Sequence, residues 1–191
     1  GMAFVSQAED GANEQLFYSR RVGRSPQADA DPRGGFAENV DHTNILGAAK
    51  LSGKTRSGWT IGLLGALTRE MHANVLDSIG TAHRDVVEPS SEYAVARLAR
   101  DWRQGRTVVG LFGTFLHRDL TPGMQWLRSS ALSLGADLNH RFAADRYRIR
   151  GWVVASSVHG APDAIARTQR SSARYFQRPD NDYVLYDTTR T

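Results

Sequence analysis

The stretch LSLGADLNHRF, residues 132–142, constrains the fold more than any other part of the chain. Apolar residues occupy most of its alternate positions, and polar residues fill the positions between them. Leu132, Leu134, Ala136, Leu138 and Phe142 share one side of an extended chain, and Ser133, Gly135, Asp137, Asn139 and Arg141 share the other. A period of two indicates a β-strand with one apolar and one polar face. The apolar face must meet either a protein core or lipid.

The alternation resumes after the polar segment AADR, residues 143–146, and continues to about residue 158. The register that keeps apolar residues on one face pairs Phe142 with Tyr147, Leu138 with Gly151, Asn139 with Arg150, and Arg141 with Arg148. Because both strands then agree about which face is apolar, the sequence predicts a β-hairpin over residues 130–158.

Two further hairpins show the same pattern less regularly. One covers residues 92–118, turns at Gln104 and Gly105, and places Leu98 opposite Leu111. The other covers residues 44–72 and turns around residues 54–56. Four residues are exceptions. The register places Arg100 on the apolar face, and it places Phe112, Leu116 and Leu64 on the polar face.

The connections between strands alternate strictly in length. Tight turns are expected near residues 54–56, 104–105 and 143–146, and long polar links near residues 22–43, 73–91, 119–129 and 159–182. In an up-and-down meander, all tight turns then lie at one end. Strands of about 10 to 13 residues, with short turns at one rim and long loops at the other, are typical of outer-membrane barrels. We therefore predict an all-β fold, an antiparallel meander of about seven or eight strands that forms a segment of such a barrel. A short helix is expected within residues 161–176.

Aromatic residues lie close to the tight turns on the apolar face: Trp59, Trp102, Phe142 and Tyr147. Amphipathic aromatic rings are favoured at membrane interfaces, where the ring body is apolar and its polar edge reaches water. We interpret these four residues as an aromatic girdle. The alternative is that they pack the core of a soluble antiparallel barrel or sandwich, which would bind a carbohydrate or a lipid.

Polar residues on the opposite face form a candidate network inside the barrel: Asp137, Asn139, Arg141, Arg148 and Arg150. Two guanidinium groups directly opposite each other repel, and a carboxylate nearby offsets that repulsion. We expect Asp137 to contact Arg150 first, with Arg148 as the alternative. This set would line a path for sugars or ions, or would plug a narrow barrel.

Arg20, Arg21 and Arg24 form the tightest basic cluster, a candidate rim site for a carboxylate or a lipid phosphate. The alternative is a set of ion pairs with acids such as Glu38 and Asp41.

The composition excludes several classes of function. The chain of 191 residues has a net charge of +4, and its arginines are spread along the sequence, which argues against a nucleic-acid partner. It has no cysteine, and its six histidines lack metal-ligand spacing, so no metal site and no cofactor are expected. No catalytic motif occurs, so a hydrolase of the cell envelope is only the third alternative for the function. No signal peptide is recognised, and both ends are expected to be cut from a longer protein.

Four ordered blocks carry a resemblance to a known family: LFYSRRVGRSP, ILGAAKLSGKTRSGWTIGLLGALT, VEPSSEYAVARLARDW and SSARYFQRPD. From about Leu16 to its end, the chain resembles the uncharacterised β-rich C-terminal region of large bacterial envelope proteins. In those proteins this region follows a domain resembling the family-nine carbohydrate-binding modules, and these 191 residues are expected not to include that domain. The resemblance implies an outer-membrane β-barrel in contact with lipid. The function that it implies is the handling or passage of surface glycans, with a carbohydrate as a possible ligand. A periplasmic or secreted location goes with the soluble alternative. The resemblance carries over no catalytic residue.

Overall fold

The computed structural model describes residues 19–172 and 185–191 of the chain. Within these residues the fold consists of nine antiparallel strands in two sheets, one 3-10 turn and one α-helix. The elements are η1 (Ser19–Arg21), β1 (Phe36–Glu38), β2 (Ile45–Lys54), β3 (Trp59–Thr68), β4 (Met71–Leu76), β5 (Ala82–Glu88), β6 (Ser90–Trp102), β7 (Thr107–Asp119), β8 (Arg128–Phe142), β9 (Tyr147–Gly160) and α1 (Pro162–Arg170).

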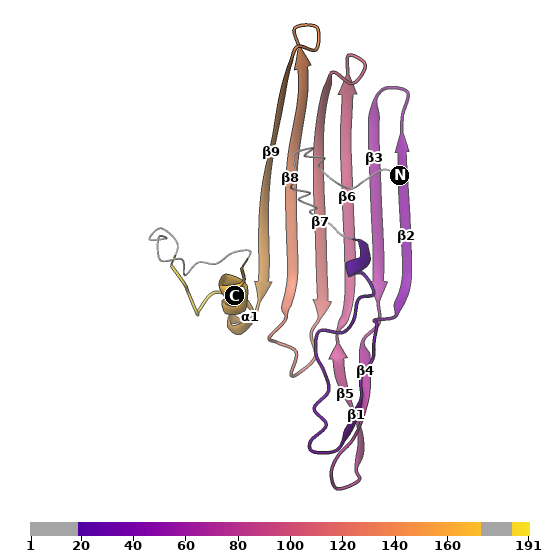
Figure 1. Ribbon diagram of the computed structural model, residues 1–191, viewed down its shortest axis with the longest axis vertical. Coiled ribbons are helices and arrows are strands. Elements are labelled where there is room, and N and C mark those ends of the chain that lie inside the picture. Colours follow the sequence, from indigo (N-terminus) through magenta and orange to yellow (C-terminus); the bar gives the residue numbers. More distant parts are fainter. Residues whose placement is uncertain (1–18, 173–184) are drawn as a thin grey trace.

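The large sheet holds six of these strands in the order β2-β3-β6-β7-β8-β9, and every neighbouring pair is antiparallel. All three tight turns lie at its upper end in Figure 1, and the long links lie at the lower end. The registers expected for two hairpins are confirmed, because Leu98 faces Leu111 and Leu138 faces Gly151. The prediction of an all-β fold with antiparallel strands is confirmed.

Backbone conformation explains why two of the turns are tight. Arg103, Gln104 and Gly105 have φ values of 53°, 59° and 81°, and Ala143, Ala144 and Asp145 have values of 52°, 55° and 65°. Three consecutive left-handed residues reverse the chain within four positions. The two turns also contact each other, because Arg106 Nε lies 3.7 Å from Asp145 Oδ1.

The second sheet was not expected from the sequence. The sequence predicts a polar link over residues 73–91, but β4 and β5 lie largely within this range and pair with β1 in the order β1-β4-β5. Ala73 and Val75 of β4 and Val87 of β5 form a small core with Ala30. These strands are short, with six residues in β4 and seven in β5, so their alternation is a weaker signal than that of the long strands. The described part of the chain therefore contains nine strands in two sheets, where about seven or eight in one meander were predicted.

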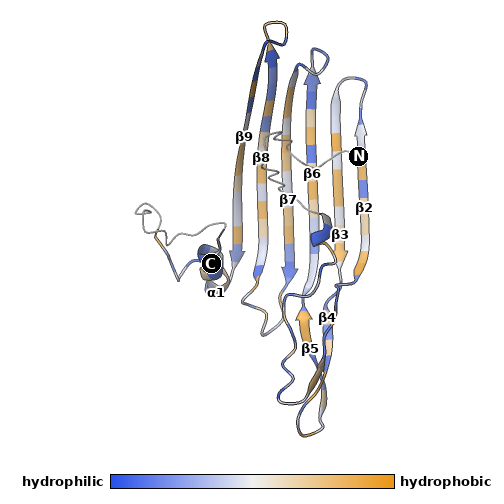
Figure 2. Cartoon of the chain, in the orientation of Figure 1, coloured by the Kyte–Doolittle hydropathy of each residue, from blue (hydrophilic) through white to orange (hydrophobic). Residues whose placement is uncertain are grey.

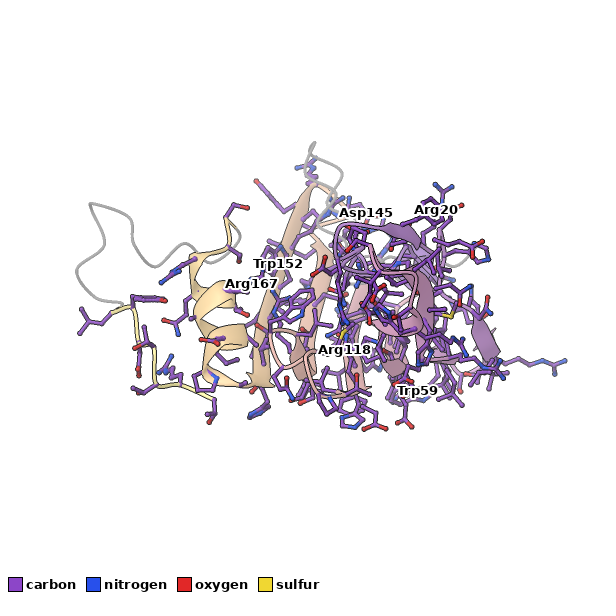
Figure 3. The ribbon with its side chains drawn as sticks, turned by 90° about the horizontal axis from the view of Figure 1, so that it is seen from below. Arg20, Trp59, Arg118, Asp145, Trp152 and Arg167 are labelled. Carbon is purple, nitrogen blue, oxygen red and sulfur yellow. The ribbon has the colours of Figure 1, made fainter. Side chains whose placement is uncertain are left out.

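The two faces of the large sheet differ in chemistry and in exposure. The apolar face, which carries Trp59, Leu98, Leu111 and Leu134, is exposed, and Leu134 has 54% of its surface accessible. The polar face carries Lys54, Arg97 and Asp137 together with small buried residues such as Ala66 and Ala99. Figure 2 shows the alternation of hydrophobic and hydrophilic residues along the strands. Figure 3, which looks at the sheet from its lower end, places Trp59 and Arg20 on opposite sides of it.

The predicted helix is present as α1, which follows β9 and packs beside it. The two edges of the large sheet are β2 and β9, and among the residues described here these two strands do not pair with each other. All ten residues of β2 are exposed.

Candidate functional site

A bidentate ion pair joins Asp137 on β8 to Arg97 on β6, across the intervening strand β7. Nη1 of Arg97 lies 2.5 Å from Oδ2 of Asp137, and Nη2 lies 2.9 Å from Oδ1. The two side chains are 17% and 22% exposed, so water screens the pair only in part. Gly110 of β7 lies directly beneath it, and a Cβ atom there would lie 2.5 Å from both Arg97 Nη2 and Asp137 Oδ2. A residue with a side chain at this position would displace the pair.

This ion pair differs from the one expected from the sequence. Arg150 and Arg148 were predicted as the partners of Asp137, whereas the ion pair that it forms is with Arg97. The other predicted members of the network share the polar face with Asp137, and Asn139 accepts a hydrogen bond of 2.9 Å from Arg148 Nε. Arg141 directly faces Arg148, and Nη2 of Arg141 donates a hydrogen bond to the Gly105 carbonyl oxygen. Arg97 was missed, although a glycine on the polar face of the strand between it and Asp137 was a signal that a long side chain crosses there.

A second ion pair on the polar face joins Lys54 to Asp101 at the tight-turn end. Lys54 ends β2, and Asp101 lies near the end of β6, two strands away. The Asp101 backbone amide also donates to the Gly58 carbonyl oxygen at 2.9 Å, so the turn between β2 and β3 is attached to β6. The polar face therefore carries two ion pairs, each of which joins strands that lie two apart in the sheet.

Aromatic rings gather on the apolar face near the tight turns. The guanidinium carbon of Arg100 lies 5.1 Å from the ring centroids of both Trp59 and Trp102, within range for a cation–π interaction. On β8 and β9, Phe142 stacks on Tyr147 at 5.5 Å and on His140 at 5.7 Å. We call this group of rings with Arg100 the aromatic belt. It contains all four residues predicted as a girdle, and their contact with a membrane remains a prediction.

A buried polar cluster lies where the large sheet meets the small one. Glu88, with only 2% of its surface exposed, accepts a hydrogen bond of 2.7 Å from the Gln27 backbone amide and lies 3.6 Å from Arg24 Nη2. Nη1 of the buried Arg118 donates to the Arg128 carbonyl oxygen at 2.9 Å. Burial lowers the pKa of the Arg118 guanidinium, and the nearby charges of Tyr93 and Glu88 partly oppose this shift. The cluster attaches the link before β1 to the base of the sheet.

The predicted basic cluster is divided in the structure. Arg20 and Arg21 lie in the η1 turn, whereas Arg24 pairs with Glu88 rather than with Glu38 or Asp41. Glu38 instead accepts a hydrogen bond from Asn74 Nδ2 at 3.0 Å.

Residues 19–172 and 185–191 hold no cluster of three or more histidine or acidic side chains arranged to bind a metal ion. His72 lies beside Glu70, His83 beside Asp85, and His140 shares a hydrogen bond of 2.9 Å with Thr107. Within the same residues, no helix is long and apolar enough to cross a membrane.

The chain was compared with protein families, curated proteins and solved structures. No curated protein and no solved structure matches it at a significant level. A family described as a domain of unknown function, DUF5916, matches residues 12–175. This match supports the resemblance to an uncharacterised family, and the carbohydrate-binding context stays a prediction. Because the match covers most of its 191 residues, the chain belongs to the DUF5916 family.

Proposed function

We propose that the large sheet is part of the wall of an outer-membrane β-barrel. The apolar face would contact lipid, and the polar face would line the interior. The observation that carries this proposal is the exposed apolar face, which extends over β3, β6, β7, β8 and β9 and ends in the aromatic belt. Its exposed side chains include Ile61, Leu63, Leu98, Leu111, Phe115, Leu132, Leu134, Leu138, Ile149 and Val153.

A continuous apolar surface of this extent is unfavourable in water. Soluble monomers rarely expose contiguous apolar patches larger than a few hundred Å². Here the buried side chains of β3 and β6 lie on the opposite face, which also holds the ion pairs of Arg97 and Lys54. This arrangement is inverted relative to a soluble sheet, and it is the arrangement expected of a strand between lipid and a polar lumen.

The dimensions of the apolar face also support the proposal. From Leu132 to Phe142 it extends over eleven residues of β8, and the ten steps between them correspond to about 34 Å along the strand. At the tilt of about 45° usual for such barrels, this is about 24 Å along the membrane normal, close to the apolar band of roughly 25 Å. The belt would lie at one interface, and the polar residues Glu92, His117 and Ser130, which share one row of the register, would lie at the other.

One feature of the polar face favours a carbohydrate as the solute that the barrel handles. Trp152 faces Asp137 across β8 and β9 and is 58% exposed, and Arg150 lies two residues before it on the same face. An exposed indole beside a carboxylate and guanidinium groups offers a sugar both a flat apolar surface and hydrogen-bonding partners. We therefore extend the proposal to the binding or passage of glycans along this face. Binding of a soluble oligosaccharide to the refolded chain, lost in Trp152→Ala, tests the extension.

The four tryptophans allow a direct test of which face meets lipid. Variants that keep a single tryptophan, with phenylalanine at the other three positions, are refolded into vesicles that contain brominated phospholipid, which quenches fluorescence on contact. Trp59 and Trp102 on the apolar face should be quenched. Trp152 on the polar face and Trp126, which contacts Arg167 at the long-link end, are the controls and should not be quenched.

Two outcomes of the quenching experiment would contradict the proposal. Equal quenching of Trp152 and Trp59 would contradict the assignment of the two faces. If no tryptophan is quenched, and the chain is compact and soluble without detergent, the soluble barrel or sandwich is the better reading.

A further inference from the structure

The tight-turn end of the large sheet is the most basic part of the molecule. Residues 54–59, 100–107 and 139–150 contain nine lysines or arginines and two aspartates, so they carry a charge of +7. The whole chain has a net charge of only +4, which leaves the remainder at −3. The spread of arginines along the sequence thus hides a strong asymmetry between the two ends of the sheet.

Both acids at this end already have partners. Asp101 pairs with Lys54 on the polar face, and Asp145 lies 3.7 Å from Arg106 between two turns. Arg56, Arg103 and Arg146 are exposed in the turns themselves. The acids of this end are therefore not placed to neutralise a cation on the apolar face.

Arg100 is that cation. Its guanidinium lies over the rings of Trp59 and Trp102, and neither a hydrogen bond nor an ion pair joins it to the residues described. Its Nε is buried and has no hydrogen-bond partner. A charge on a lipid-facing surface is tolerated near the interface and disfavoured at the midplane. Arg100 lies two residues from the end of β6, which places it at the level of the belt.

We propose that Arg100 binds the phosphate group of an anionic phospholipid while its guanidinium stays over the rings of Trp59 and Trp102. A planar guanidinium whose faces contact aromatic rings still presents N–H donors at its edge, and two of them match the oxygens of one phosphate. Arg56, Arg103 and Arg146 attract neighbouring headgroups of the same leaflet. This inference rests on the proposed membrane location and adds the class of lipid that the tight-turn end selects.

The test compares binding of the full chain to vesicles of phosphatidylcholine with binding to vesicles that also contain phosphatidylglycerol, at fixed ionic strength. The wild-type chain should prefer the anionic vesicles. Arg100→Gln should reduce this preference about five-fold, the factor expected for one basic residue close to an anionic surface. Arg84→Gln is the matched control, because Arg84 is an exposed arginine on β5, away from the tight turns. Arg100→Lys, which keeps the charge, should restore part of the preference.

Four results would overturn the inference. They are equal binding of the wild type to both kinds of vesicle, an equal loss in Arg84→Gln, and DNA competing with the anionic vesicles more strongly than chloride does. The fourth is a preference that inorganic phosphate abolishes and chloride at the same ionic strength does not, which would assign the site to free phosphate. Insertion into both kinds of vesicle without a preference leaves the membrane proposal standing. Failure to insert into either one contradicts that proposal instead.

Discussion

Arg97 on β6 reaches Asp137 on β8 across the backbone of β7, and the two side chains form a bidentate ion pair above Gly110. The two residues are 40 positions apart in the sequence. The pair connects three strands on the polar face, and it depends on the absence of a side chain at Gly110.

Gly110→Ala should therefore destabilise the chain although it adds only a methyl group. A Cβ atom 2.5 Å from Arg97 Nη2 must push the guanidinium and the carboxylate apart, while the strand backbone stays in place. We expect a loss of about 1–2 kcal/mol, measured by urea-driven unfolding of the refolded chain in detergent micelles. Gly65→Ala is the control, because the nearest atom would lie 3.9 Å away; it should be neutral or stabilising by about 0.5–1 kcal/mol. Equal effects of the two substitutions would contradict this role of Gly110.

A double-mutant cycle of Arg97→Gln and Asp137→Asn measures the pair directly. Each single variant leaves one partly buried charge without its partner, so each should cost about 1–3 kcal/mol. The double variant should lose less than the sum, with a coupling energy of about 1 kcal/mol that shrinks as salt is added. A parallel cycle of Arg97→Gln with Asp101→Asn should be additive, because Asp101 pairs with Lys54. Additivity in the first cycle would show that the contact contributes nothing to stability.

Glu88→Gln should loosen the attachment of residues 24–43 to the sheet. Glu88 is buried, accepts the Gln27 amide at 2.7 Å, and lies near both Arg24 and Arg118. Removing the negative charge of Glu88 weakens the hydrogen bonds that this buried side chain accepts. We expect the free energy of unfolding to fall by about 2–3 kcal/mol. Hydrogen exchange should accelerate at the amide of Ala28, which donates to the Val87 carbonyl oxygen at 3.1 Å. Glu92→Gln, an exposed change on the apolar face, serves as the control and should leave this exchange rate unchanged.

Leu111→Arg distinguishes a face in lipid from a face in water. Leu111 faces Ala136 near the middle of the apolar face and is 55% exposed, so in a soluble protein an arginine there would be nearly neutral. In a bilayer the same change should cost about 2–4 kcal/mol, whereas Tyr147→Arg at the level of the belt should cost at most about 1 kcal/mol. Urea titrations of the variants folded in vesicles measure the difference. Similar values for both positions would contradict the depth that we assign to them.

Local pattern was sufficient to predict the pairing of β6 with β7 and of β8 with β9. Phe142 faces Tyr147 and Leu98 faces Leu111 as expected, because a period of two and a tight turn together leave one register in which both strands agree about their faces. The pairing of β1 with β4 in the small sheet has no such local signal. More than thirty residues separate the two strands, so no tight turn connects them.

The sequence by itself determined which face of each strand is polar, and hence that Asp137, Asn139, Arg148 and Arg150 share a face. Only the tertiary structure decided which arginine pairs with Asp137. Strand periodicity limits a side chain to one face, but its partner is any group of opposite charge within reach on that face, including groups two strands away. Arg97 is long enough to cross β7, and Gly110 leaves the path open. That contact exists only once β6, β7 and β8 lie side by side in register.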